Sequence, residues 1–185
     1  LRAGDRDAAA AALDALPSVG PRSAAALTVA RALEDDGLSD GAEWLYRRVL
    51  EQAPESATAA NNLAFLQVRS GRATEETVRL ARTALRAAVA AGVAPAAESS
   101  ILDTLGHAQL AAGDAASASD TFRRAVGLAP DKLSSRIGLA IALWQDGQRD
   151  EAREALAHAE ALAGGAPPPD PFLSRVLTAA RSEIR

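Results

Sequence analysis

The stretch "LDTLGHAQLAAGDAASASDTFRRAVGLAP" (Leu102–Pro130) predicts two helices joined by a tight turn. Gly113 marks the turn, because glycine readily takes the left-handed backbone conformation that ends a helix. Pro130 marks the end of the second helix, since proline lacks the N–H that a helix interior requires. The stretch is therefore interpreted as one helix–turn–helix unit.

The same unit recurs along the chain at a constant spacing. Gly37 and Gly71 lie 34 residues apart, as do Gly113 and Gly147, and the interval from Gly71 to Gly113 is one such period with eight extra residues. Three of these glycines are followed at fixed spacing by an alanine and then a bulky residue: Ala42 and Tyr46, Ala118 and Phe122, Ala152 and Leu156. A fixed period of this length indicates a tandem array of helical hairpins.

The pattern resembles the tetratricopeptide repeat, whose 34-residue signature is W-x2-L-G-x2-Y, then A-x3-F, then P. The opening stretch carries Leu105-Gly106, Ala118, Phe122 and Pro130 in register, and Ala25–Pro54, Asn61–Leu85 and Arg136–Leu162 match in part. The likeness covers roughly 140 residues. It implies an all-α, right-handed α-solenoid of stacked helix pairs, in which the first helix of each pair lines a concave face.

On this basis we expect a single solenoid domain over residues 1–185. Its parts are a partial repeat over 1–20, repeats over 23–56, 57–98, 99–132 and 133–166, and a capping helix over 170–185. The chain starts within a unit and without methionine, so we expect a piece of a longer protein. Small residues, namely Ala30, Ala64, Gly106 and Ala140 facing Ala42, Ala118 and Ala152, are expected where helices cross.

The long repeat and the C-terminal end depart from the regular pattern. Most of the eight extra residues fall in Arg86–Ser99, where we expect the second helix to run to about Ala91 and stop at Gly92. That segment is either a tolerated insertion or a contact for a partner. Near the end, Asp170 is expected to cap a last helix that Pro171 opens and that covers the final repeat.

Composition narrows the classes of function. The formal net charge of −4 argues against a nucleic-acid partner, which would require a basic stripe. The absence of cysteine excludes disulfides and thiolate chemistry, and no apolar run approaches the ~20 residues of a membrane span. Alanine makes up about a quarter of the residues, and arginine supplies nearly all positive charge, with Lys132 the single lysine. We expect a soluble bacterial protein, cytoplasmic or periplasmic, without a cofactor.

Asp103 and His107 lie four residues apart on one face of a predicted helix. The pair is either a polar pair on a solvated helix face or a contact for a ligand in the groove. Catalysis or metal binding has less support, because no nucleophile accompanies the pair and the second histidine, His158, belongs to another repeat.

The resemblance implies that one side of each first helix projects into the concave groove. Asn62 stands where many peptide-binding members use asparagine on a ligand backbone, although Asn61 and Asn62 could instead cap or pack. Chaperone-binding members carry basic residues where this sequence has Ser100 and Thr104, which argues against a carboxylate clamp. The residues assigned to the groove are Arg31, Asn61, Asn62, Phe65, Arg69, Asp103, His107 and Trp144.

The two tryptophans are interpreted separately. Trp44 lies in a second helix, where packing against the neighbouring unit is expected. Trp144 ends a first helix and is either a groove anchor or covered by the last helix. Glu34–Asp36 places three acids at a helix C-terminus, on a solvated edge or toward a basic partner.

The function expected from the resemblance is that of a protein–protein interaction scaffold that binds a partner protein or peptide in its concave groove. Two alternatives remain open: a non-catalytic regulatory part of a larger enzyme or regulator, and a module that self-associates into a homo-oligomer. No catalytic, metal or cofactor site is assigned.

Overall fold

The structure is a computed structural model that describes residues 22–164 and 167–184, together with residues 7 and 11. Over these ranges the chain forms nine helices and no strand. They are α2 (Arg22–Asp35), α3 (Ser39–Gln52), α4 (Ala57–Arg69), α5 (Glu75–Ala90), α6 (Pro95–Ala111), α7 (Ala115–Leu128), α8 (Leu133–Gln145), α9 (Arg149–Ala163) and α10 (Pro171–Ile184). The all-α fold is confirmed, and the partial repeat expected over 1–20 lies outside the described residues.

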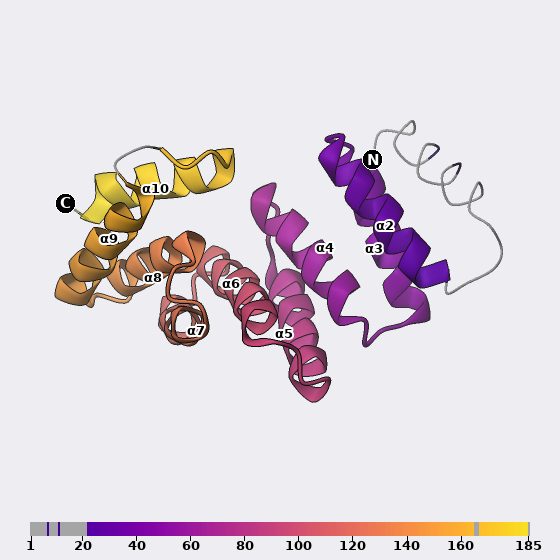
Figure 1. The fold of residues 1–185 in the computed structure, drawn as a ribbon, viewed down its shortest axis with the longest axis horizontal. Helices are drawn as coiled ribbons and strands as arrows, with labels where there is room; N and C mark the ends of the chain where they lie inside the picture. Colours follow the sequence, from indigo (N-terminus) through magenta and orange to yellow (C-terminus); the bar gives the residue numbers. More distant parts are fainter. Residues whose placement is uncertain (1–6, 8–10, 12–21, 165–166, 185) are drawn as a thin grey trace.

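Consecutive helices pack in pairs, and the pairs stack in the order of the chain. Figure 1 shows α2 with α3, α4 with α5, α6 with α7 and α8 with α9 along an arc that opens toward α10. The helices α5 and α7 lie on the outer side of the arc, and α4, α6 and α8 face its inner side. Helical hairpins that stack in the order of the chain form an α-solenoid.

The glycines that set the period end the first helix of each pair. Gly37, Gly71, Gly113 and Gly147 have φ of 76°, 68°, 79° and 84°. An L-residue with a side chain rarely adopts this conformation, so glycine is required at each turn. The helices meet closely because small residues lie between them. The six alanines predicted at crossings have no exposed surface: Ala30, Ala42, Ala64, Ala118, Ala140 and Ala152.

The tightest crossing surrounds Phe122, which is fully buried. A Cβ added at Gly106 of α6 would lie 2.6 Å from the Phe122 ring, and one added at Gly138 of α8 would lie 2.3 Å from it. Both distances are far below van der Waals contact, so the ring occupies a slot that two glycines open. Sequence reasoning predicted the role of Gly106 and missed that of Gly138.

The eight extra residues lengthen two helices. The helix α5 ends at Ala90, and Gly92 takes a φ of 63°, as predicted. The helix α6 begins at Pro95, four residues before the repeat boundary predicted at residue 99, since proline is favoured in the first turn of a helix. As a result α5 has 16 residues and α6 has 17, against 13 in α4 and α8.

The last helix is present as predicted and reaches further than predicted. Asp170 Oδ1 accepts a hydrogen bond from the Phe172 backbone N–H at 2.8 Å, which caps α10. Leu177, Ala180 and Ile184 are buried in a cluster shared with α8 and α9. The opposite end of α10, its start, extends along the inner side of the arc toward α4 (Figure 1).

Within the described ranges, no helix is both long enough and apolar enough to cross a membrane.

Candidate functional site

Two adjoining cavities lie on the inner side of the arc. One, of about 460 Å³, is bounded by residues of α2, α3 and α4, and the other, of about 310 Å³, by residues of α2, α4, α6, α8 and α10. Four side chains line both cavities: Arg31, Asn62, Phe65 and Arg69. We call the two adjoining cavities together the inner groove.

Six of the eight residues assigned to the groove from the sequence line this hollow. They are Arg31, Asn61, Asn62, Phe65, Arg69 and Asp103. His107 and Trp144 line neither cavity. The helix α4 supplies four of the six, because Asn61, Asn62, Phe65 and Arg69 recur at the spacing of one helix face.

The larger cavity contains both signs of charge. Arg31 and Arg69 line it together with the acids Glu34 and Asp35. The Tyr46 hydroxyl donates a hydrogen bond to Glu34 Oε2 at 2.6 Å, and burial together with this acid raises the pKa of Tyr46 above its ordinary value. The tyrosine therefore stays protonated and holds Glu34 at the rim of the cavity.

The two asparagines of α4 have different surroundings. Asn62 Nδ2 donates to the Tyr46 hydroxyl oxygen at 3.4 Å, so its amide is oriented by α3. Asn61 Oδ1 is buried and has no hydrogen-bond partner among the described residues. A buried acceptor of this kind costs about 1–3 kcal/mol until a donor reaches it. Asn61 lines the smaller cavity and is the one of the two asparagines whose amide oxygen lacks a donor.

Arg69 binds the start of α10, 101 residues further along the chain. Its Nη1 donates to Asp170 Oδ2 at 2.7 Å and its Nη2 to Asp170 Oδ1 at 3.2 Å. The guanidinium carbon also lies 5.4 Å from the ring centroid of Phe65 and 5.6 Å from that of Phe172. Arg69 thus holds a carboxylate in the two-pronged geometry that arginine favours, between two aromatic rings.

Sequence reasoning missed Asp170 and Phe172 as groove residues. It assigned Asp170 to the cap of α10 and Phe172 to the apolar stripe of that helix. Nothing local to residues 170–172 points to α4, because the contact depends on how far the arc curves. The one feature of the sequence that could have indicated this contact is an acidic residue close to an aromatic one at the start of a helix.

Asp103 ties neighbouring helix pairs together. The hydroxyls of Ser134 and Ser135, at the start of α8, donate to its two carboxylate oxygens at 2.9 and 2.7 Å. Lys132 Nζ lies 3.9 Å from Asp103 Oδ2. Asp103 is 6% exposed, so the expectation of a polar pair on a solvated helix face is wrong. Asp103 of α6 is thus buried, and both of its carboxylate oxygens accept hydrogen bonds from α8.

His107 is buried between two aromatic rings. Its ring centroid lies 5.0 Å from that of Phe122 and 5.5 Å from that of Phe172, and both contacts are edge-to-face. Burial lowers the pKa of His107 below its ordinary value, against the opposing effect of Asp103, whose Oδ1 lies 4.0 Å from Nε2. The imidazole is therefore uncharged near neutral pH, and it packs against the ring of Phe172.

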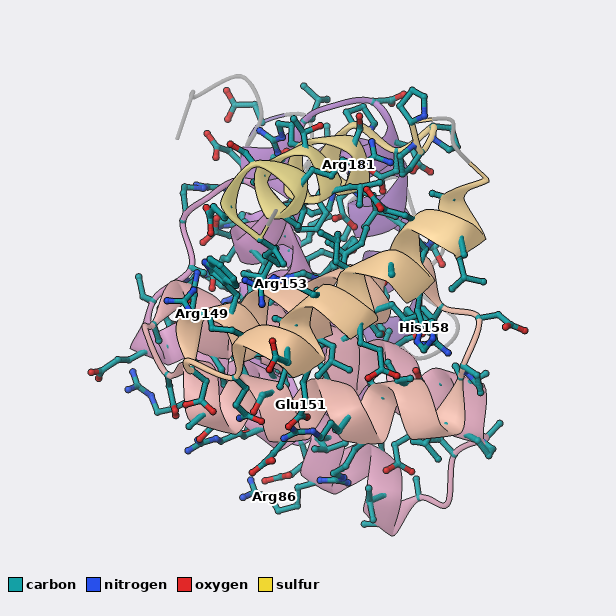
Figure 2. The ribbon with its side chains drawn as sticks, turned by 90° about the vertical axis from the view of Figure 1, so that its left-hand side faces the viewer. Arg86, Arg149, Glu151, Arg153, His158 and Arg181 are labelled. Carbon is teal, nitrogen blue, oxygen red and sulfur yellow. The ribbon has the colours of Figure 1, made fainter. Side chains whose placement is uncertain are left out.

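The tryptophans are packing residues in the described part of the chain. Trp144 is partly buried against the cluster of α8, α9 and α10, and the guanidinium of Arg149 lies 3.7 Å from its ring centroid. Trp44 packs against the cluster formed by α2, α3 and α4. Figure 2 shows Arg149 and Arg153 together on α9, with His158 toward the other end of that helix.

No metal-binding arrangement is present in residues 22–164 and 167–184, since no three His, Asp or Glu side chains gather there.

Comparison with known proteins supports the repeat assignment. A family model described as tetratricopeptide repeat matches residues 109–168. A search of curated protein sequences finds no match.

Solved structures resemble the chain over most of its length. The protein MamA (MSR-1) aligns at 22% identity with a TM-score of 0.66 and covers 87% of this chain and 88% of its own. YrrB, described as a TPR protein with an unusual peptide-binding site, aligns at 20% identity with a TM-score of 0.63 over 87% of this chain and 78% of its own. A putative kinesin light chain from Podospora anserina with TPR-like repeats aligns at 22% identity with a TM-score of 0.65 over 87% of this chain and 84% of its own.

The 34-residue period, the stacked helix pairs, the matched family model and these structural neighbours agree with one another. Residues 109–168 match the tetratricopeptide repeat family, and the described residues share the fold of these repeat proteins.

Proposed function

We propose that the chain is a non-catalytic protein-interaction module whose inner groove binds an extended peptide segment of a partner protein. The observation that carries the proposal is that two cavities adjoin on the inner side of the arc and share Arg31, Asn62, Phe65 and Arg69. The described peptide-binding site of YrrB, a protein of the same fold, supports this use of the groove.

The groove offers the polar and apolar contacts that an extended peptide needs. The amide groups of Asn61 and Asn62 suit a peptide backbone, whose N–H and C=O groups require partners once they leave water. Phe65 provides an aromatic surface for one side chain of the ligand. Because Glu34 and Asp35 accompany the two arginines, the groove is a poor match for a phosphate backbone and a better one for a peptide of mixed charge.

A peptide display selection against the full chain tests the proposal. The selected peptides are titrated by fluorescence anisotropy onto the wild type, onto Phe65→Ala and onto Val89→Ala. Val89 is a matched control, because it is an exposed apolar residue (53%) near the end of α5 on the outer side of the arc.

We expect Phe65→Ala to weaken binding about tenfold or more, as truncation of an interface aromatic often does, and Val89→Ala to leave it unchanged. Peptides that bind Phe65→Ala as tightly as the wild type would contradict the assignment of the groove. Weakened binding to Val89→Ala would instead place the ligand on the outer side of the arc.

A further inference from the structure

The start of α10 is the part of the chain that lies in the inner groove. Asp170, Phe172 and Leu173 line the smaller cavity together with residues of α4 and α6. Asp170 and Phe172 contact Arg69 at once, the first through its carboxylate and the second through its ring. A short segment of this chain thus makes the kind of contact that a bound peptide would make.

The two halves of α10 are held with unequal strength. The second half is anchored by the buried side chains Leu177, Ala180 and Ile184. Arg181 also pairs there with Glu160 at 2.9 Å, in an ion pair that is partly exposed. Figure 2 shows Arg181 on α10, above the ribbon of α9. This anchorage lies on α8 and α9 and does not depend on α4.

The first half is held by groups that are partly open to water. In the pair that joins α10 to α4, the side chains of Arg69 and Asp170 are 35% and 33% exposed. Ion pairs with this much access to water contribute little to stability, because water and salt screen them. Phe172 is only partly buried. The start of α10 can therefore leave the groove while the second half stays in place.

The side chains that hold the start of α10 also define the chemistry of a ligand that could replace it. The forked guanidinium of Arg69 matches a carboxylate and lies within stacking distance of two rings. The His107 ring packs edge-to-face against the Phe172 ring, with the centroids 5.5 Å apart, and its burial disfavours the charged form. The carboxylate and the ring reach these groups together because Asp170 and Phe172 lie two positions apart, with Pro171 between them.

Resting on the proposed peptide-binding function, we propose that the start of α10 occupies the site of a partner peptide that carries an acidic residue followed two positions later by an aromatic one. Within its own chain the segment competes with that peptide. The fraction of molecules whose groove is open sets the apparent affinity for the partner.

The test uses the full chain and a labelled peptide with the sequence of residues 167–176, PPPDPFLSRV. The opened variant is Asp170→Asn with Phe172→Ala. Asparagine keeps the helix cap and removes the charge, and Leu177, Ala180 and Ile184 still anchor the helix. Glu183→Gln, which makes the same acid-to-amide change at an exposed position of α10, is the matched control. Circular dichroism confirms that each variant is folded.

We expect the opened variant to bind the labelled peptide at least tenfold more tightly than the wild type or Glu183→Gln, because the internal competitor is removed. Adding Arg69→Gln to the opened variant should abolish this gain. A peptide in which the acidic residue is changed to Asn, or the aromatic one to Ala, should bind poorly.

Equal binding of the labelled peptide to the wild type and the opened variant would overturn the inference, as would absence of binding to both. A wild type whose mass rises with concentration, while the opened variant stays monomeric, would also overturn it, because the segment would then occupy the groove of a second copy. If display-selected peptides depend on Phe65 yet bind both proteins equally, the proposed function stands and this inference fails. If they ignore Phe65, the proposed function itself fails.

Discussion

The crossing around Phe122 and the inner groove around Arg69 differ in the size, charge and exposure of their side chains. At Phe122 a large ring fills a slot between two glycines, and nothing exposed takes part. At Arg69 the side chains are long, charged and partly exposed, and cavities of about 460 and 310 Å³ remain beside them. The difference separates the part of the molecule that sets its stability from the part that is available to bind.

The largest expected effect is at the crossing. Phe122→Ala should lower the free energy of unfolding by about 3–5 kcal/mol, because a fully buried ring is lost and the helices around it cannot collapse onto the space. Urea denaturation followed by circular dichroism measures the change. Phe65→Ala in the groove is the comparison, and an equal loss in the two variants would remove the contrast between the regions.

A smaller effect is expected from adding one methyl group. Gly138→Ala should destabilise the chain by about 1–3 kcal/mol, because the new Cβ would lie 2.3 Å from the Phe122 ring. Gly127→Ala is the matched control: no atom lies within 4 Å of its added Cβ, so helix propensity alone should make it neutral or stabilising. Phe122→Leu should partly rescue Gly138→Ala in thermal unfolding. A tolerated Gly138→Ala would show that the crossing has room to spare.

The buried imidazole between the two regions should make stability depend on pH. Because burial lowers the pKa of His107 in the folded chain, the unfolded chain binds the extra proton first as pH falls. The stability is present above the unfolded pKa of about 6.5 and is lost below it, by up to about 1.4 kcal/mol per pH unit from this group. Asp103 and Lys132 are the charged groups nearest the ring.

His107→Phe should remove this contribution from the slope of unfolding free energy between pH 7 and pH 5, whatever its effect on stability at pH 7. Urea denaturation at several pH values provides the measurement. An unchanged slope would mean that His107 is as readily protonated in the folded chain as in the unfolded one.

The smallest expected effect is at the contact between α4 and α10. Arg69→Gln should lower the free energy of unfolding by less than about 1 kcal/mol, since the pair with Asp170 is open to solvent. The difference between wild type and variant should shrink further as salt rises from 0.05 to about 1 M. A decrease in the free energy of unfolding as large as that of Phe122→Ala would mean that the contact between α4 and α10 is needed for stability.

The fold could be predicted from the sequence because the residues that recur with the 34-residue period have local structural roles. Glycines at the turns, alanines at the crossings and Pro171 at the start of α10 each act within a few residues of their own position. The helix α6 starts at Pro95, inside the inserted segment and four residues before the repeat boundary predicted at residue 99.

The site was harder to predict, because it depends on the curvature of the stack. Neighbouring residues on α4 share a helix face, so Asn61, Asn62, Phe65 and Arg69 were found together. The contact of Arg69 with Asp170 joins positions 101 residues apart and has no local signal. For Asp103 and His107 one of the two interpretations was a solvated polar pair, whereas α7, α8 and the start of α10 cover both residues. Such burial is a property of the assembled stack.

The most direct test of the groove is a nuclear magnetic resonance titration of the isotope-labelled chain with a display-selected peptide. Binding in the groove predicts that backbone amide signals of Asn61, Asn62 and Phe65 shift, that those of Asp170 and Phe172 shift with them, and that Val89 stays unchanged. Shifts confined to α5 and α7, on the outer side of the arc, would contradict it.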